Sequence, residues 1–437
     1  MTSATDYQPG AASESIQYVL VGYSGDLLTY LDLFLPADSV LVVEEPEVIR
    51  NRGAQERVAD FRCVVGILAA PAQDEDSAEK LPSEVSMPPH VRAVVPAHDY
   101  AVVAAASLAQ AWGRPGAGID AARVFRDKSL LRETAGKAGI AQPEWLLACS
   151  AAEVADFRAK AGGRCVIKPT NRQSSEGVQL LGPDDDVAAA WDYALAGGGR
   201  GTVMRAEHFT HARCLVERML DGPEMSAELL LQDGQVRFFN ATLKRVLPGR
   251  HPVEMGHVVP GPDAGGVSDR LKESMCALAE AAGFSSGLMH GEWIIEDGVP
   301  QLVECAGRLP GDHIHKLIEL AYDWDLLRNW FAVLQGDPPV ALSAPVRGSA
   351  IRFLSAPPGR VHAIHGVDQA RTLRGVHSVA VQVAAGDTVE AVRSSWERLG
   401  YVIATGADGA AAERVSADAQ QLVTIETLLP PEASRHP

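Results

Sequence analysis

Short apolar runs alternate with helical stretches through the first hundred residues, and this alternation restricts the fold more than any other feature. Strands are expected at 18–22, 40–43, 63–66 and 93–96, followed by a helix at 101–112. Strands that alternate with helices pair in parallel. The sequence therefore predicts an N-terminal parallel α/β domain. Residues 70–90, rich in Pro, Ser, Asp and Glu, are expected to form an exposed loop.

The first strand ends in Gly22-Tyr-Ser-Gly25, which raises the question of a dinucleotide site. A dinucleotide-binding turn requires Gly-x-Gly-x-x-Gly spacing, which is absent, and Glu44 and Glu45 alone give weak support. We interpret this segment as a plain turn at a strand end.

Clusters of proline and glycine divide the remainder of the chain. The first boundary lies at Gly113-Arg-Pro-Gly116, and the second runs from Gly336-Asp-Pro-Pro339 to Ala344-Pro345. Beyond the second boundary, the patterning predicts two strands and two helices, at 349–354, 379–383, 394–399 and 410–421. About three domains suit a chain of 437 residues, and we expect them at 1–114, 115–343 and 344–437.

Composition narrows the class of partner and the compartment. A formal net charge of −17 repels phosphate backbones and argues against nucleic acid. No apolar run approaches the ~20 residues that span a bilayer, and the N-terminus lacks a signal-peptide pattern. Six scattered cysteines without a Cys-x-x-Cys pair suit reduced thiols. We expect a cytoplasmic protein that binds small molecules and does not associate with a membrane. The sequence does not decide whether the protein forms a homodimer.

Lysine is rare, with eight in the chain, so the position of each one is informative. Lys168 ends an apolar strand and is followed directly by proline and by a polar loop, 170–178. A strand-borne ammonium beside a polar loop can clamp a polyphosphate, because loop N–H and hydroxyl groups fold over the phosphates. Taken alone, a surface lysine before a turn would give the same pattern.

Two further segments carry candidate ligands. Residues 216–230 form a strand, a turn and a second strand, which can present backbone groups to an adenine edge. Glu292 and Glu304 lie on two strands joined by a turn at Glu296-Asp-Gly-Val, and a two-residue period puts both on one side of the sheet. Such carboxylates suit Mg²⁺. Arg308 would bring a fixed positive fork to the same place.

Taken together, these motifs resemble the ATP-grasp enzymes. Lys128, Lys168-Pro, Glu217-x-x-Leu220-x-Gly-x-Glu224 and Glu292…Glu304-x-x-x-Arg308 occur in the order and spacing of that superfamily. With Glu254-Met-Gly-His257, the chain is most similar to the L-amino acid ligases that make dipeptides, of the bacilysin-type alanine ligase kind, over nearly its whole length. The resemblance implies an ATP-grasp domain with a small lobe at about 125–215 and a large lobe at about 216–343, then a C-terminal α+β domain.

The resemblance also implies a reaction and a set of roles. The expected enzyme is an ADP-forming ligase that activates a carboxylate as an acyl phosphate and joins it to an amine. The phosphates of ATP would be held by Lys128, Lys168 and the loop residues Ser174, Ser175 and Gly177. The segment with Glu217, Arg218 and Leu220 would bind adenine, and Glu224 ribose. Mg²⁺, with Mn²⁺ as an alternative, would bind Glu292 and Glu304. Arg308 and Lys244 would be the catalytic residues. The substrate pocket would be lined by Glu254, His257, Arg308 and Asp312.

The chain departs from the wider superfamily in two places. Ala306 stands where many relatives carry asparagine, and the loop at 171–176 has few glycines. Neither substrate is named by the sequence, although Leu309-Pro-Gly-Asp312 predicts a roomy or polar pocket. Cys305 is expected to pack on the far face of its strand. Roles for His290 and for the segment 98–100 stay open.

Two rival functions remain. The chain could be an ATP-grasp kinase that phosphorylates a small molecule, or a nucleotide-binding protein without turnover. The segment 254–260, which resembles an amino-acid pocket, argues against a kinase. The retained Glu292, Glu304 and Arg308 argue against loss of turnover.

Overall fold

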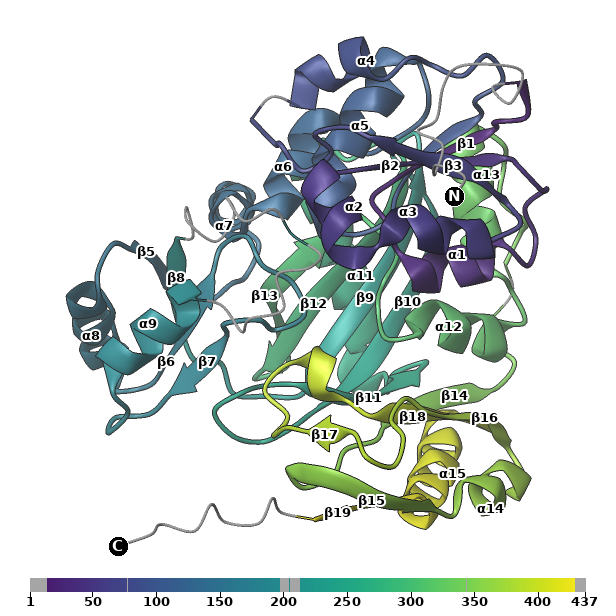
Figure 1. Ribbon diagram of the computed structural model, residues 1–437. Helices are drawn as coiled ribbons and strands as arrows, with labels where there is room; N and C mark the ends of the chain where they lie inside the picture. The colour runs from purple at the N-terminus through teal and green to yellow at the C-terminus, as the bar shows by residue number, and fades with distance from the viewer. Residues whose placement is uncertain (1–13, 77, 197–203, 205–212, 343, 429–437) are drawn as a thin grey trace, which may run out of the picture.

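The computed structural model describes residues 14–76, 78–196, 204, 213–342 and 344–428. The predicted N-terminal and C-terminal domains therefore extend at 1–13 and 429–437 beyond the described residues. Figure 1 shows an N-terminal α/β layer above a large central sheet, with a small lobe to one side and the C-terminal region below. Within the described residues, no helix has both the length and the apolar character needed to cross a membrane.

The N-terminal layer is a parallel sheet in the order β3-β2-β1-β4, as the alternating pattern predicts. Its strands are β1 (Tyr18–Val21), β2 (Val40–Glu44), β3 (Val64–Ala69) and β4 (Ala93–Pro96). Its helices are α1 (Gly25–Leu31), α2 (Pro46–Arg52), α3 (Ala54–Arg57), α4 (Leu81–Glu84) and α5 (Val102–Ala111). The expectation of an exposed loop at 70–90 is wrong in part, because Leu81 and Val85 are buried in the core around α4.

The turn at Gly22 is a strand-end turn. Gly22 has φ +95, a backbone conformation that other residues rarely adopt. A Cβ there would also lie 2.6 Å from Nε2 of His98, so both the backbone and the available space favour glycine. Ser24 then caps α1 by accepting a hydrogen bond from the Leu27 N–H at 3.3 Å.

The small lobe is an antiparallel sheet in the order β5-β8-β6-β7. Its elements are β5 (Trp145–Ala148), α8 (Ala151–Lys160), β6 (Cys165–Pro169), β7 (Gln179–Leu181), α9 (Val187–Ala196) and β8 (Cys214–Arg218). Two helices, α6 (Ile119–Arg126) and α7 (Lys128–Lys137), lead into this lobe. Asp127 caps α7 through the N–H groups of Ser129 and Leu130, which fixes Lys128 at the helix start.

The large sheet has eight strands in the order β13-β12-β9-β10-β11-β14-β18-β16, and every neighbouring pair is antiparallel. The strands are β9 (Glu224–Gln232), β10 (Gln235–Val246), β11 (Glu254–Val259), β12 (Gly287–Glu296), β13 (Val299–Ala306), β14 (Gly348–Phe353), β16 (Val376–Val381) and β18 (Gly400–Gly406). The associated helices are α11 (Val267–Ala282), α12 (Ile314–Tyr322) and α13 (Leu326–Gln335). The sheet thus runs across the predicted boundary at 343/344.

The rest of the C-terminal region covers the end of this sheet. It contains a three-stranded sheet in the order β17-β15-β19 and two helices. The elements are β15 (Gly359–His365), α14 (Val367–Thr372), β17 (Thr388–Val389), α15 (Gly409–Leu422) and β19 (Thr424–Leu428). The helix expected at 394–399 is a single 3₁₀ turn, η7 (Ser395–Glu397), because Ser394 and Glu397 close a capping box and Arg398 already has extended backbone.

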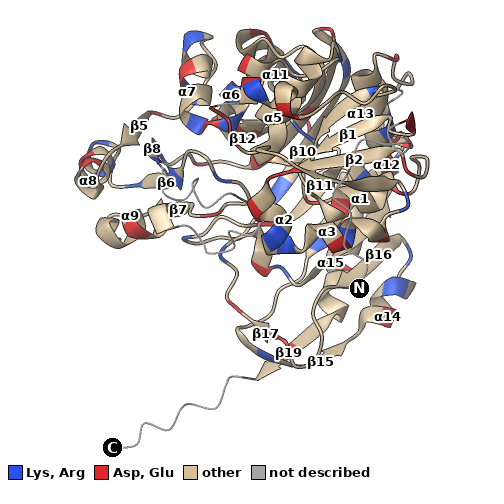
Figure 2. Cartoon of the chain, turned by 45° about the horizontal axis from the view of Figure 1, so that its top comes forward, with Lys and Arg blue, Asp and Glu red and all other residues tan. Residues whose placement is uncertain are grey.

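Basic and acidic positions are interspersed over the whole cartoon (Figure 2). Inside the molecule, lysine and arginine side chains form ion pairs with carboxylates. The candidate site is built from such contacts.

One core histidine in α12 makes the stability of the fold sensitive to acid. His315 is 8% exposed, and neither of its ring nitrogens has a hydrogen-bond partner among the described residues. Burial lowers the pKa of His315 to about 3, with smaller contributions from His313 and Lys316. An unfolded histidine binds its proton near pH 6.5. Folded stability is therefore lost as the pH falls from about 6.5 toward 3.

We expect His315→Phe to reduce this acid sensitivity. The loss attributable to His315 amounts to about 1.4 kcal/mol per pH unit below 6.5, and phenylalanine keeps the ring that packs edge-on against Tyr30. Melting temperatures of both proteins at pH 8.0, 6.5 and 5.0 provide the measurement. We expect the melting temperature of the variant to fall less than that of the wild type as the pH falls. Equal decreases in the two melting temperatures would contradict the burial of a neutral imidazole.

Candidate active site

The hairpin of β12 and β13 sets two carboxylates side by side. Glu292 pairs directly with Glu304 across the ladder, and both side chains line one cavity. Cys305, the next residue, is fully buried in the core beneath the sheet, and burial raises the pKa of its thiol. The predicted shared face of the two glutamates is confirmed, but it depends on a register shift between Glu292 and Trp293 that two-residue periodicity does not predict.

At one end of the cavity, Glu217 holds two cations in place. Its carboxylate accepts from Nε of Arg132 at 2.7 Å and pairs with Nζ of Lys168 at 2.8 Å. Burial opposes its charge, but Arg132 and Lys168 outweigh burial and hold the pKa of Glu217 below its usual range. The Glu217 side chain thus orients Lys168. Arg132 was missed from the sequence, although it lies one helical turn from Lys128 on α7.

Lys128 ties the polar loop to the carboxylates. Its ammonium lies 2.8 Å from Glu304 and donates to the backbone oxygen of Arg172 at 2.7 Å. The loop itself turns through left-handed backbone at Ser174 and Ser175, with φ of 59 and 58. Gly177 has φ +79, and a Cβ there would lie 2.8 Å from the ring of Pro169. The loop contains few glycines, but its conformation requires glycine at position 177.

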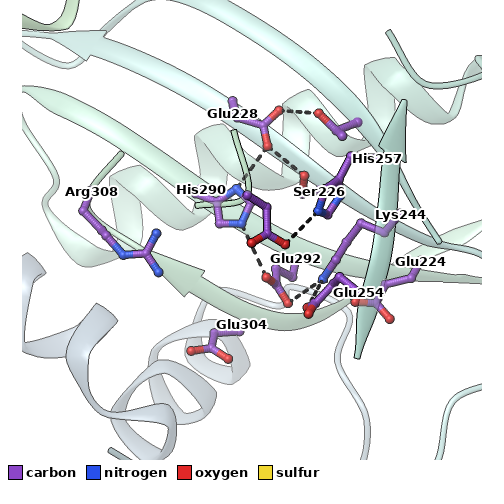
Figure 3. A network of polar contacts seen from close by, with 12 residues as sticks. Glu224, Ser226, Glu228, Lys244, Glu254, His257, His290, Glu292, Glu304 and Arg308 are labelled. Atoms are coloured by element: carbon purple, nitrogen blue, oxygen red, sulfur yellow. Dashed lines mark hydrogen bonds and ion pairs between the residues drawn. The ribbon is translucent and has the colours of Figure 1, made fainter. Parts of the chain in front are cut away.

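Lys244 lies at the centre of three carboxylates. Its ammonium pairs with Glu224, with Glu292 at 2.9 Å and with Glu254 at 3.1 Å, and its side chain is 1% exposed (Figure 3). Burial would lower its pKa, but the three glutamates together raise the pKa of Lys244 well above its usual value. Oxygens of the three carboxylates lie within 4.8 Å of one another. Strands β9, β10, β11 and β12 each contribute one member.

His290 contacts this cluster through Glu292. Nδ1 lies 3.0 Å from Glu228, and Nε2 lies 3.4 Å from Glu292 (Figure 3). Burial alone would lower its pKa, but hydrogen bonds to the two glutamates raise the pKa of His290 to about 9. Glu228 also accepts from Ser226, Asn240 and Thr242, the last two at 2.7 and 2.8 Å. His290, left open by the sequence, is therefore a charged support for Glu292.

Arg308 is held by the N-terminal layer. Its Nε and Nη2 donate to the two oxygens of Asp99 at 2.9 and 2.7 Å, and Nη1 donates to the oxygen of Leu309. Figure 3 shows Arg308 and Glu304 facing the same space beside Glu292. Asp99 lies in the segment 98–100, whose role the sequence left open. Its contact with Arg308 spans 209 residues of chain.

The far wall of the cavity carries Glu254, His257 and Asp312. Nε2 of His257 lies 3.0 Å from Asp312, and Asp312 also binds Arg398. Arg398 was missed from the sequence, since it lies outside every motif. It reaches Asp312 because the C-terminal region folds back onto the large lobe, and it does not itself line the cavity.

Lys128, Lys168, Lys244, Arg308 and the carboxylates that they bind surround one cavity of about 600 Å³. Their supports Arg132, Glu228 and Arg398 do not line it. Every site residue expected from the sequence lines it except Gly177, which shapes the loop at its edge. Lys128 and Lys168 lie toward the small lobe, while His257 and Asp312 lie toward the C-terminal region. The cavity thus offers cations at one end, carboxylates in the middle and a mixed polar wall at the other.

Two family models match the chain. Residues 162–316 match the ATP-grasp domain, and residues 352–428 match the L-amino acid ligase C-terminal domain 2. Residues 162–316 thus match an ATP-grasp domain. The resemblance to ATP-grasp enzymes and to L-amino acid ligases that the sequence predicts is confirmed for these two parts of the chain.

Curated relatives of the chain are distant and match it in part. The uncharacterized protein y4rH of Sinorhizobium fredii is 26% identical over 66% of the chain and 58% of its own length. A formate-dependent phosphoribosylglycinamide formyltransferase of Xanthomonas campestris is 33% identical over 23% of each protein. The chain thus spans between about a quarter and three fifths of these relatives.

Solved structures share the complete fold. An L-amino acid ligase from Bacillus licheniformis superposes with a TM-score of 0.75 at 16% identity, covering 95% of this chain and 99% of the other. The biotin carboxylase domain of 2-oxoglutarate carboxylase from Hydrogenobacter thermophilus, solved with MgADP, gives 0.65 at 12% identity over 94% and 91%. At such identities, the likeness concerns the fold, and it confirms the predicted architecture.

Carboxylate oxygens of this site are donors of the kind that Mg²⁺ prefers, in a set of one or two together with phosphate oxygens. The centre of the cluster of three carboxylates is, however, occupied by the ammonium of Lys244. The cluster of three includes Glu292 together with Glu224 and Glu254, whereas Glu304, the second expected ligand, binds Lys128. Mg²⁺ held by Glu292 and Glu304 therefore stays a prediction.

Glu304→Gln tests that assignment. The amide keeps the size of the side chain but loses the charge, so we expect ADP formation to fall at least tenfold and to require more Mg²⁺ for half-maximal rate. Initial rates across a Mg²⁺ titration provide the measurement. An unchanged rate and an unchanged Mg²⁺ dependence would contradict the assignment.

Proposed function

We propose that this protein joins the carboxylate of one small molecule, an amino acid, to the amine of another, with ATP converted to ADP and phosphate. The observation that carries the proposal is the single cavity that gathers the phosphate-binding lysines, Arg308 and the His257–Asp312 wall. A nucleotide at one end and two small substrates at the other would meet beside Arg308. The two family matches support the same reading.

The nucleotide would occupy the end nearest the small lobe. Lys168, held by Glu217, and Lys128 would bind the phosphates, and the loop with Ser174 and Ser175 would fold over them. Backbone groups from Arg218 to Leu220 would bind adenine, with Glu224 on the ribose. Mg²⁺ on Glu292 and Glu304 would supply positive charge beside the phosphates.

The first step forms an acyl phosphate. A carboxylate oxygen attacks the γ-phosphorus as the bond to the ADP oxygen breaks, and negative charge spreads over the phosphoryl oxygens. Lys168 and Arg308 are fixed by Glu217 and Asp99, so they stabilise this charge without reorganising. Positioning and electrostatics account for the rate without a covalent enzyme nucleophile.

The second step forms the amide. The amine nitrogen attacks the acyl carbon, the carbon–oxygen bond to phosphate breaks, and the nitrogen loses a proton. Arg308 would stabilise the tetrahedral intermediate, while Glu254 and His257 would line the substrate side of the cavity. Closure of the loop at 170–178 would exclude water, which would otherwise hydrolyse the acyl phosphate.

Six unpaired cysteines support the proposed cytoplasmic setting, because four of them are buried as free thiols in the core. Reduced buried thiols need no oxidising compartment. Small molecules are the proposed partners.

ADP release from MgATP tests the proposal, with amino acids supplied singly and in pairs and products weighed by mass spectrometry. Release that requires two substrates, with a product lighter than their sum by one water, supports ligation. A product heavier by one phosphoryl group would replace ligation by a kinase reaction. Absence of ADP with every pair would contradict turnover on amino acids.

A further inference from the structure

One arginine of the C-terminal region, Arg398, binds Asp312 from behind the wall of the substrate cavity. Arg398 follows η7, where the Ser394 N–H and hydroxyl both donate to Glu397 at 2.7 Å. This capping box fixes the turn. The Arg398 side chain is 11% exposed, and its guanidinium stacks 3.7 Å from the ring centroid of Phe353.

The Arg398 guanidinium is bound on nearly all sides. Nη1 donates to Oδ2 of Asp312 at 2.7 Å and to the backbone carbonyl oxygen of Glu254 at 3.1 Å, while Nη2 donates to Oδ1 of Asp312 at 2.5 Å. Nε donates to the oxygen of Ser395 at 3.0 Å. Such a two-pronged contact needs the planar fork of arginine, and lysine cannot reproduce it.

Asp312 is the member of this pair that faces the cavity. It lies at φ 56, between Gly311 and His313, and its side chain lines the cavity next to His257 and Glu254. Both of its oxygens are occupied, one by Arg398 alone and the other by Arg398 and Nε2 of His257. Burial opposes its charge, but Arg398 and His257 hold the pKa of Asp312 well below its usual range.

We propose that Arg398 is a positioning and specificity-determining residue: it cancels the charge of Asp312, so that this end of the cavity accepts an amino acid with an uncharged side chain. The inference rests on the proposed function. A carboxylate facing the cavity would by itself attract a cationic side chain. Because both oxygens of Asp312 accept hydrogen bonds from Arg398, the pair presents no net charge to the cavity. Asp312 then serves to orient His257.

The pairing predicts a change of specificity. Arg398→Met keeps a long apolar side chain over Phe353 but leaves the Asp312 carboxylate uncompensated inside the wall. We expect this variant to favour lysine or arginine over neutral amino acids by at least tenfold relative to the wild type. The double variant Arg398→Met/Asp312→Asn removes the exposed charge and returns the preference to neutral amino acids. Arg398→Lys keeps the charge and should keep the neutral preference.

Binding measurements test this without requiring turnover. Isothermal titration of lysine, arginine, leucine and glutamine is carried out in the presence of MgADP with the wild type and the three variants. Arg245→Met serves as the matched control, because Arg245 makes a similar two-pronged contact, with Glu413 at 2.6 and 2.9 Å, and does not line the cavity. A variant that was only destabilised would lose affinity for all four amino acids to a similar extent.

An Arg398→Met protein with the wild-type order of affinities would overturn the inference, and so would a wild type that binds none of the four. Failure of the proposed function is recognised separately, by absence of ADP release in the wild type. A shift toward lysine and arginine that the double variant reverses supports the assignment of Arg398.

Discussion

Replacing Arg308 with methionine is expected to lower kcat by about 100- to 1,000-fold while the KM for ATP changes by less than about threefold. Arg308 faces the carboxylates of Glu292 and Glu304 (Figure 3). Under the proposed reaction, its charge would stabilise the negative charge that develops on the transferred phosphoryl group and on the tetrahedral intermediate. Steady-state rates with a productive substrate pair provide the measurement.

The control for this variant concerns Asp99. Without Arg308, the buried Asp99 carboxylate loses both of its hydrogen bonds to the guanidinium, which destabilises the protein by itself. The double variant Arg308→Met/Asp99→Asn removes that unpaired charge and should recover stability but not kcat. A single variant with nearly normal kcat would remove Arg308 from the catalytic site.

Replacing Lys244 with methionine is expected to lower the free energy of unfolding by about 3–5 kcal/mol, because three glutamates then lose their shared counter-ion in a buried site. Activity should be lost as well. Urea unfolding at pH 7 and ADP formation provide the two measurements.

A second substitution separates charge from packing in this cluster. In the Lys244→Met background, Glu224→Gln removes one of the three negative charges and should restore part of the stability without restoring activity. Unchanged stability in the Lys244→Met protein would contradict the view of Lys244 as the buried counter-ion.

Much of the fold could be predicted because local patterns determine it. Each N-terminal strand is a short apolar run with turn residues after it, and the run length alone separates strand from helix. The β12–β13 hairpin follows from Asp297 and Gly298, which adopt φ of 50 and 79 between the two strands. With that turn fixed, Trp293 pairs with Leu302. The pairing of Glu292 with Glu304 depends in addition on a register shift between Glu292 and Trp293, which the turn does not predict.

The partners of the site residues could not be predicted in the same way. Arg132 meets Glu217 across 85 residues, Asp99 meets Arg308 across 209, and Arg398 meets Asp312 across 86. No periodicity encodes such contacts, because they arise only when separate layers pack together. The resemblance predicted residues that line the cavity, and the structure adds those that hold them in place.

The segment from 336 to 345 shows a different limit of sequence patterns. Its prolines predict a boundary, and the chain does leave α13 there. Beyond it, however, β14 pairs with β11 and extends the large sheet, with Gly256 opposite Arg352. A proline-rich segment marks an exposed connection but does not reveal whether the next strand returns to the same sheet.

Isotope transfer tests the acyl-phosphate reaction most directly. The carboxylate substrate is supplied with both oxygens as ¹⁸O, and the released phosphate is analysed by mass spectrometry after ligation. Transfer of the carboxylate oxygen to phosphorus predicts one ¹⁸O in each phosphate released and one retained in the amide. Unlabelled phosphate, or ¹⁸O recovered in AMP, would contradict it.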